Sequence, residues 1–120
     1  MQATLWEAPV YVNEIVPTSV ATISGETLEI KYDETGGYYY VDVTFKEGLT
    51  ILINTRVEPT DSTNKSLKIT VTNNNDPAKP RAKVGDKREI FIFRKGIVKV
   101  QYRAQDKATA ATMNFWIYVT

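Results

Sequence analysis

Apolar and polar residues alternate over much of the chain, which is the pattern of half-buried β-strands. At residues 38–45 every second side chain is apolar (Tyr39, Val41, Val43, Phe45). Successive side chains of a strand point to opposite faces, so such a segment buries one face and exposes the other. The same alternation recurs elsewhere, and it predicts further strands at residues 28–32, 51–57, 67–71, 90–92, 97–100 and 115–119.

Turn-forming residues separate the predicted strands. They lie at residues 46–48, 58–61, 73–77 and 95–96, where Gly, Pro, Asn and Asp favour turns or end strands. Helical signals are nearly absent, because the Ala-rich stretch at residues 104–111 is interrupted by polar residues and is too short to hold a helix unaided. Short strands at close spacing are typical of a β-sandwich or barrel, so the fold class is predicted to be all-β.

Residues 1–37 follow a less regular pattern. Two prolines interrupt this segment, and its apolar residues before the strand at 28–32 form only short β pieces: Val10, Val12, Ile15, Val20 and Ile23. We therefore divide the chain into a β-sandwich over residues 38–120 and an N-terminal part with two alternative roles. Residues 1–37 either form an extended arm that attaches elsewhere, for example by adding a strand to a neighbouring subunit, or supply additional strands to the same sandwich.

The composition narrows the chemistry. The 120 residues include no Cys and no His, which excludes zinc sites built on these ligands, iron–sulfur clusters, Cys nucleophiles and Ser–His pairs. The acidic residues do not form the Asp-x-Asp-x-Asp loop of a calcium site. We therefore expect no enzyme, no cofactor and no metal site. Because 15 Lys and Arg nearly balance 14 Asp and Glu, the net charge of +1 creates no overall field that would attract nucleic acid.

The start of the sequence carries no export signal. Residues 1–9 lack both the basic region and the apolar run of a secretory signal peptide. No stretch approaches the ~18 consecutive apolar residues of a membrane-spanning helix, so we expect no membrane insertion. If Met1 is the native start, the protein works in the cytoplasm or leaves the cell by another route, such as incorporation into a virus particle.

The spacing from Gly48 onward is more specific. Gly48, Ile53, Val57 and Pro59 resemble the motif G-E-x-x-x-L-x-x-x-V-x-P of the bacterial immunoglobulin-like group 2 (BIG2) domain, with Leu49 in place of the Glu. Residues 60–69 (TDSTNKSLKI) resemble the segment A-x-A-T-N-K-x-V-x-W that follows in the family, at unchanged length.

Three later segments extend the resemblance over residues 38–120. Residues 75–77 are similar to the family's S-S-D-P turn, residues 95–100 to its A-G-T-A-x-I strand, and residues 111–119 to its closing strand. The sequence departs from the family at Ile69, where BIG2 domains usually have a core Trp. We expect another aromatic side chain, Phe115 or Trp116, to fill the interior instead.

The resemblance implies a fold and a class of function. The fold is an immunoglobulin-like Greek-key β-sandwich of about seven strands. The function is that of a non-enzymatic structural or adhesive module, present singly in tailed-phage virions and as repeats in bacterial surface proteins. We expect a virion protein that is made in the host cytoplasm and contacts a capsid or tail lattice or copies of itself. The alternative is a module of a bacterial cell-surface adhesin that binds glycans.

Aromatic and basic residues are the candidates for partner binding. An aromatic surface able to contact a protein or a cell-surface glycan would include Tyr38 and Tyr40, while the N-terminal part offers Trp6 and Tyr11. Lys79 and Arg81 lie in a basic stretch that suits an acidic protein surface, and nucleic acid is a disfavoured partner. Tyr residues that only cover the sheet, and Lys residues that only protect an edge strand, are the structural alternatives.

Overall fold

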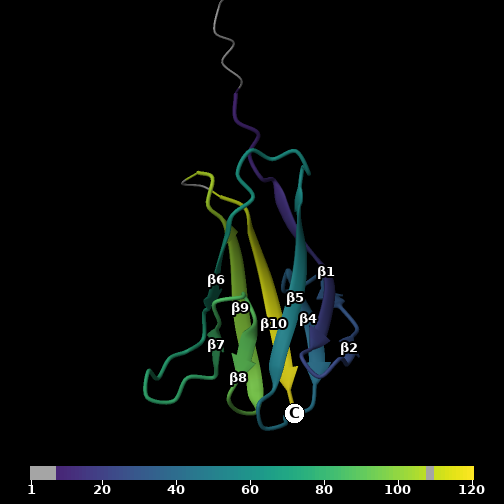
Figure 1. Cartoon of the computed structure of the whole chain (residues 1–120), viewed down its shortest axis with the longest axis vertical. Helices are drawn as coiled ribbons and strands as arrows, with labels where there is room; N and C mark the ends of the chain where they lie inside the picture. Colours follow the sequence, from purple (N-terminus) through teal and green to yellow (C-terminus); the bar gives the residue numbers. More distant parts are fainter. Residues whose placement is uncertain (1–7, 108–109) are drawn as a thin grey trace, which may run out of the picture.

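The computed structural model describes residues 8–107 and 110–120 as a sandwich of two five-stranded sheets (Figure 1). Sheet A has the strand order β2-β1-β5-β8-β7, and sheet B has the order β3-β4-β10-β9-β6. Sheet A contains β1 (Glu14–Thr22), β2 (Thr27–Leu28), β5 (Thr50–Glu58), β7 (Ala82–Val84) and β8 (Ile90–Ile92). Sheet B contains β3 (Lys31–Asp33), β4 (Tyr38–Val43), β6 (Leu67–Val71), β9 (Gly96–Ala104) and β10 (Thr112–Val119).

The predicted all-β sandwich is confirmed, but the strand number of about seven is too low. The structure has ten strands, and no helix occurs within the described residues. Four of the strands, β2, β3, β7 and β8, have only two or three residues each. Segments this short show little alternation of apolar and polar residues, so a sequence pattern with a period of two residues cannot count them reliably.

The N-terminal segment supplies strands to both sheets from residue 14 onward. β1 lies between β2 and β5 in sheet A, and its side chains Ile15 and Val20 are buried. A β-bulge between Pro17 and Ser19 shifts the register against β5. Ahead of β1, the backbone N–H of Val12 donates to Asp106 Oδ2 at 2.7 Å, which ties this stretch to the loop after β9.

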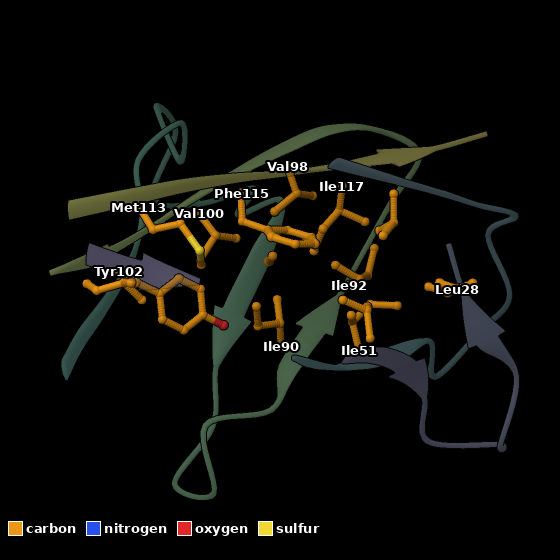
Figure 2. Packing of buried hydrophobic residues seen from close by; sticks show 14 of the residues in the cluster. Leu28, Ile51, Ile90, Ile92, Val98, Val100, Tyr102, Met113, Phe115 and Ile117 are labelled. Carbon is orange, nitrogen blue, oxygen red and sulfur yellow. The ribbon is translucent and has the colours of Figure 1, made fainter. Parts of the chain in front are cut away.

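The hydrophobic core fills the space between the sheets. Five side chains are the most completely enclosed, each with 0% exposure: Val41, Ile51, Ile90, Phe115 and Ile117. Figure 2 shows Ile51, Ile90, Phe115 and Ile117 packed between the sheets. Phe115 of β10 thus provides the expected interior aromatic group, whereas Trp116, the next residue, is only half-buried. The strict alternation along β10 places Trp116 on the outer face of sheet B.

One strand pair is parallel and determines which outer-face residues meet. β4 and β10 run parallel, with Tyr40 opposite Trp116, while the other recorded strand pairs are antiparallel. The two strands come from distant parts of the sequence. Their pairing brings the outward side chains of residues 38–42 beside those of residues 114–118.

Candidate functional site

Four aromatic side chains gather on the outer side of sheet B. Tyr38 and Tyr40 project outward from β4 because Val41 and Val43, in the opposite phase, are buried. Trp116 and Tyr118 project outward from β10 for the same reason. We call Tyr38, Tyr40, Trp116 and Tyr118 the aromatic face. All four are half-buried, so their rings pack on one another and still meet solvent.

The rings of the aromatic face contact one another in defined geometries. Tyr38 stacks on Trp116 with ring centroids 3.6 Å apart and planes within 10°. Tyr40 meets Tyr118 at 5.3 Å with perpendicular planes, an edge-to-face arrangement. The edge-to-face pair is a favoured aromatic geometry and contributes roughly 0.5–1.5 kcal/mol beyond the buried area. Tyr38 and Trp116 lie almost directly over one another, a closely packed face-to-face arrangement that is less favoured than an offset stack. The rings therefore hold one another in place.

Hydroxyl groups connect this cluster to the turn before β4. The Tyr38 hydroxyl donates to Asp33 Oδ2 at 3.1 Å and lies 3.0 Å from the Tyr118 hydroxyl. Since Tyr38 gives its single proton to Asp33, Tyr118 is the donor in the second bond. The bond to Tyr118, followed by burial and the bond to Asp33, raises the pKa of Tyr38. The Gly36 N–H, followed by Tyr38, lowers the pKa of Asp33, so Asp33 is a carboxylate at neutral pH.

Two lysines complete the face. Lys99 Nζ on β9 lies 4.2 Å from the Trp116 ring centroid. Lys31 Nζ lies 5.8 Å from the Tyr40 ring and forms a 2.9 Å ion pair with Asp42. That ion pair raises the pKa of Lys31.

Both faces of the Trp116 ring are covered. The Tyr38 ring occupies one face at stacking distance, which leaves no room there for an ammonium group, so Lys99 must lie over the other. The strand order agrees, because β4 and β9 flank β10 on opposite sides. A sugar ring that binds by stacking needs an open aromatic face, and Trp116 does not offer one. The part of the Trp116 ring that remains exposed is its edge, and Lys31 and Lys99 lie beside the aromatic face.

The described residues provide no metal site. No group of three or more Asp or Glu residues in them is placed to hold a metal ion. None of the described segments is a helix long and apolar enough to cross a membrane.

The structure brings together only two of the residues predicted to bind a partner. Tyr38 and Tyr40 belong to the aromatic face, whereas Tyr11 is 39% exposed in the segment before β1, with Lys107 Nζ 4.7 Å from its ring centroid. Lys79 and Arg81 lie between β6 and β7, at the opposite edge of sheet B from β3 and β4. Trp6 lies outside the described residues. These positions form several separate surfaces.

Sequence patterns indicated one half of the aromatic face and missed the other. Tyr118 was not among the predicted partner-binding residues, and Trp116 was one of the two candidates for the interior. Alternation along residues 113–119 carries the signal, because Met113, Phe115, Ile117 and Val119 take the inward positions. The parallel pairing of β4 with β10 cannot be predicted from either segment alone, because the two strands lie far apart in the sequence.

The comparisons with known proteins leave the family open. No protein-family model matches the chain, and neither the curated proteins nor the solved structures contain a significant match. A function for the chain can therefore be inferred only from its fold, from the geometry of the aromatic face and from the motif resemblance.

Proposed function

We propose that the chain is a non-enzymatic, BIG2-like interaction module of a tailed-phage virion, and that it binds a protein of the capsid or tail through the aromatic face. The observation that carries this proposal is the clamped Trp116, held between Tyr38 and Lys99 on an outer sheet face. Trp and Tyr side chains dominate the binding energy of protein interfaces. A ring that is already fixed loses little conformational entropy on binding.

Motif spacing supports the BIG2-like assignment. The Gly48-to-Pro59 spacing and the segment at residues 60–69 resemble BIG2 domains. The resemblance implies a structural or adhesive module, and single domains of this family occur in tailed-phage virions.

The alternative is a glycan-binding module of a bacterial surface adhesin. Stacking of a sugar on Trp116 would require the loss of its contact with Tyr38 or with Lys99. Tyr40 would then have to supply the platform. The geometry therefore favours a protein partner, and an oligosaccharide array separates the two alternatives.

The test is co-sedimentation of the purified chain with the capsids or tails encoded beside its gene. We expect Trp116→Ala and Tyr40→Ala to weaken binding at least tenfold, as truncation of central interface aromatics does. Phe91→Ala is the matched control, because Phe91 is an exposed aromatic residue on the outer side of sheet A. Undiminished binding of both face variants would overturn the proposal. Oligosaccharide binding that is lost in Tyr40→Ala would favour the adhesin alternative.

A further inference from the structure

β5 is much longer than the strand beside it. It has nine residues, and β8 pairs with it only at Thr50 and Ile51. β1 covers the other edge of β5 from Ile51 to Glu58. On the β8 side, residues 52–58 have no strand partner anywhere in the described parts of the chain. This leaves roughly 23 Å of open strand edge, at about 3.3 Å per residue.

A groove runs along this open edge between the two sheets. It consists of two adjoining cavities of about 320 and 250 Å³, which share Thr55 and Arg88 in their walls. Ile53 of sheet A and Ile69 of sheet B line the larger cavity, and Leu67 lines the smaller one. In Figure 1 the short strands β7 and β8 accompany only part of the length of β5. The groove therefore continues the line of β8 beyond the end of the β7–β8 hairpin.

A buried hydroxyl group without a partner forms part of the groove wall. Tyr102 of β9 is only 2% exposed, and its hydroxyl makes no hydrogen bond to any residue that the structure describes. Its side chain lines the larger cavity, and Figure 2 shows the ring reaching from sheet B toward sheet A. Burial raises the pKa of Tyr102, so the group remains a neutral donor. A buried hydroxyl without a hydrogen bond destabilises the fold, and a ligand with an acceptor at this position would remove that cost.

The rim of the groove is cationic. Arg56, Lys65, Lys87 and Arg88 line the two cavities, and no carboxylate is among the described lining residues. Arg56 pairs with Glu58 at 2.7 Å. Within the described residues, neither Lys65 nor Lys87 nor Arg88 forms an ion pair.

We propose that this edge groove binds an extended acidic peptide segment of a partner protein, which joins sheet A as an added strand beside residues 52–58 of β5. Backbone groups of the peptide pair with the open edge, and alternate apolar side chains enter the cavities over Ile53 and Ile69. A peptide carbonyl or carboxylate accepts the Tyr102 proton. Carboxylates on the outward positions meet Lys87 and Arg88 at the rim.

Charge selects this occupant over the N-terminus of a second copy. Residues 1–7 of the chain carry a single carboxylate, that of Glu7, which is a poor complement to three rim cations, Lys65, Lys87 and Arg88, that have no ion pair among the described residues. The groove is also separate from the aromatic face, which lies on the outer side of sheet B. The edge proposal therefore stands or falls independently of the proposed function.

The experiment uses the full chain and a blocked peptide of about nine residues in which Asp alternates with Val. A matched peptide with Lys in place of every Asp is the control. We expect saturable binding of the acidic peptide only, together with slower amide hydrogen exchange in residues 52–58. Arg88→Asn should weaken binding, since Asn tolerates the left-handed conformation of Arg88 (φ 64°) and removes the charge. Lys46→Gln is the matched control, because Lys46 is an exposed lysine between β4 and β5 that lines neither cavity, and it should leave binding unchanged.

Tyr102→Phe distinguishes a ligand-binding role of the hydroxyl from a structural one. Loss of one hydrogen bond should weaken peptide binding roughly fivefold. The same substitution removes an unsatisfied buried group, so the free energy of unfolding without peptide should stay the same or rise. A less stable variant with unchanged peptide affinity would show that the hydroxyl serves the fold and would contradict the proposal.

Three other outcomes would overturn the proposal. One is equal affinity for the acidic and the Lys peptides, and another is no saturation up to about 1 mM peptide. The third is self-association of the chain that protects residues 52–58, which would identify a second copy as the occupant.

Discussion

Tyr38 and Trp116 stack face to face at 3.6 Å, although β4 and β10 lie far apart in the sequence. The stack exists because the closing strand runs parallel to β4 and places its outward side chains beside those of β4. It covers one face of the indole, and Lys99 covers the other. The parallel pairing of β4 with β10 therefore determines that neither face of the Trp116 ring is open on the outer side of sheet B.

The stack should be measurable as a coupling energy. We expect Tyr38→Leu and Trp116→Leu to be non-additive by about 0.5–3 kcal/mol in the free energy of unfolding, because the two side chains are in direct contact. Urea denaturation of both single variants and the double variant gives the value. The control cycle combines Trp116→Leu with Tyr32→Leu, because Tyr32 packs against Tyr39 and not against Trp116. Additivity within ~0.3 kcal/mol in both cycles would contradict a stabilising stack.

A glycine makes room for this stack. A Cβ atom added at Gly36 would overlap the ring of Tyr38. Gly36→Ala should therefore displace the ring and cost about 1 kcal/mol of unfolding free energy, with a weaker near-ultraviolet circular dichroism signal from Trp116. In a Tyr38→Ala background the overlap is gone, so the cost of Gly36→Ala should largely disappear. An equal cost in both backgrounds would assign the effect to the turn and not to the ring.

Local alternation was enough to predict most of the long strands. Those at residues 38–43, 50–58 and 67–71 were each predicted within two residues of the observed bounds, and the predicted strand at 115–119 covers the last five residues of β10. β1 was not recognised as one strand, because the bulge after Pro17 shifts its inward positions from Ile15 and Pro17 to Val20 and Thr22. A β-bulge adds one residue to the strand, so the alternation of apolar and polar residues with a period of two is interrupted there and does not predict one continuous strand.

Local sequence patterns predicted only part of the aromatic face. Tyr38 and Tyr40 stand out in the sequence as part of a Tyr triplet, so they were predicted as candidates. Trp116 was one of two candidates, with Phe115, for the interior aromatic group that replaces the core Trp of BIG2 domains, because Ile69 stands at that position. Its outward position depends on the phase of β10, and its partners depend on long-range pairing that no neighbouring residue specifies.

Ile15 should be essential to the fold although it lies in the N-terminal segment. Its side chain is 2% exposed in a strand at the interior of sheet A, so Ile15→Ala should lower the free energy of unfolding by about 2–5 kcal/mol. Ile23→Ala is the matched control, because Ile23 is 65% exposed just after the same strand. Its effect should stay within about 0.5 kcal/mol. Similar urea midpoints for the two variants would contradict the burial of β1 in the core.

Tyr102 should make the protein sensitive to alkali. Its folded-state pKa is raised by burial above the ordinary value of 10.0, so below about pH 10 both the folded and the unfolded chain keep the proton. Above that pH the unfolded state releases the proton first. The free energy of unfolding then falls by at most about 1.4 kcal/mol per pH unit until the folded-state pKa is reached.

Tyr102→Phe removes this contribution. Urea denaturation at about pH 9, 10 and 11 should show a smaller loss of stability in Tyr102→Phe than in the wild type. Tyr32→Phe is the matched control, because its ring is 51% exposed, and its pH dependence should follow that of the wild type. Equal losses in Tyr102→Phe and the wild type would mean that the hydroxyl is accessible to water at high pH, which would also remove the buried donor from the wall of the edge groove.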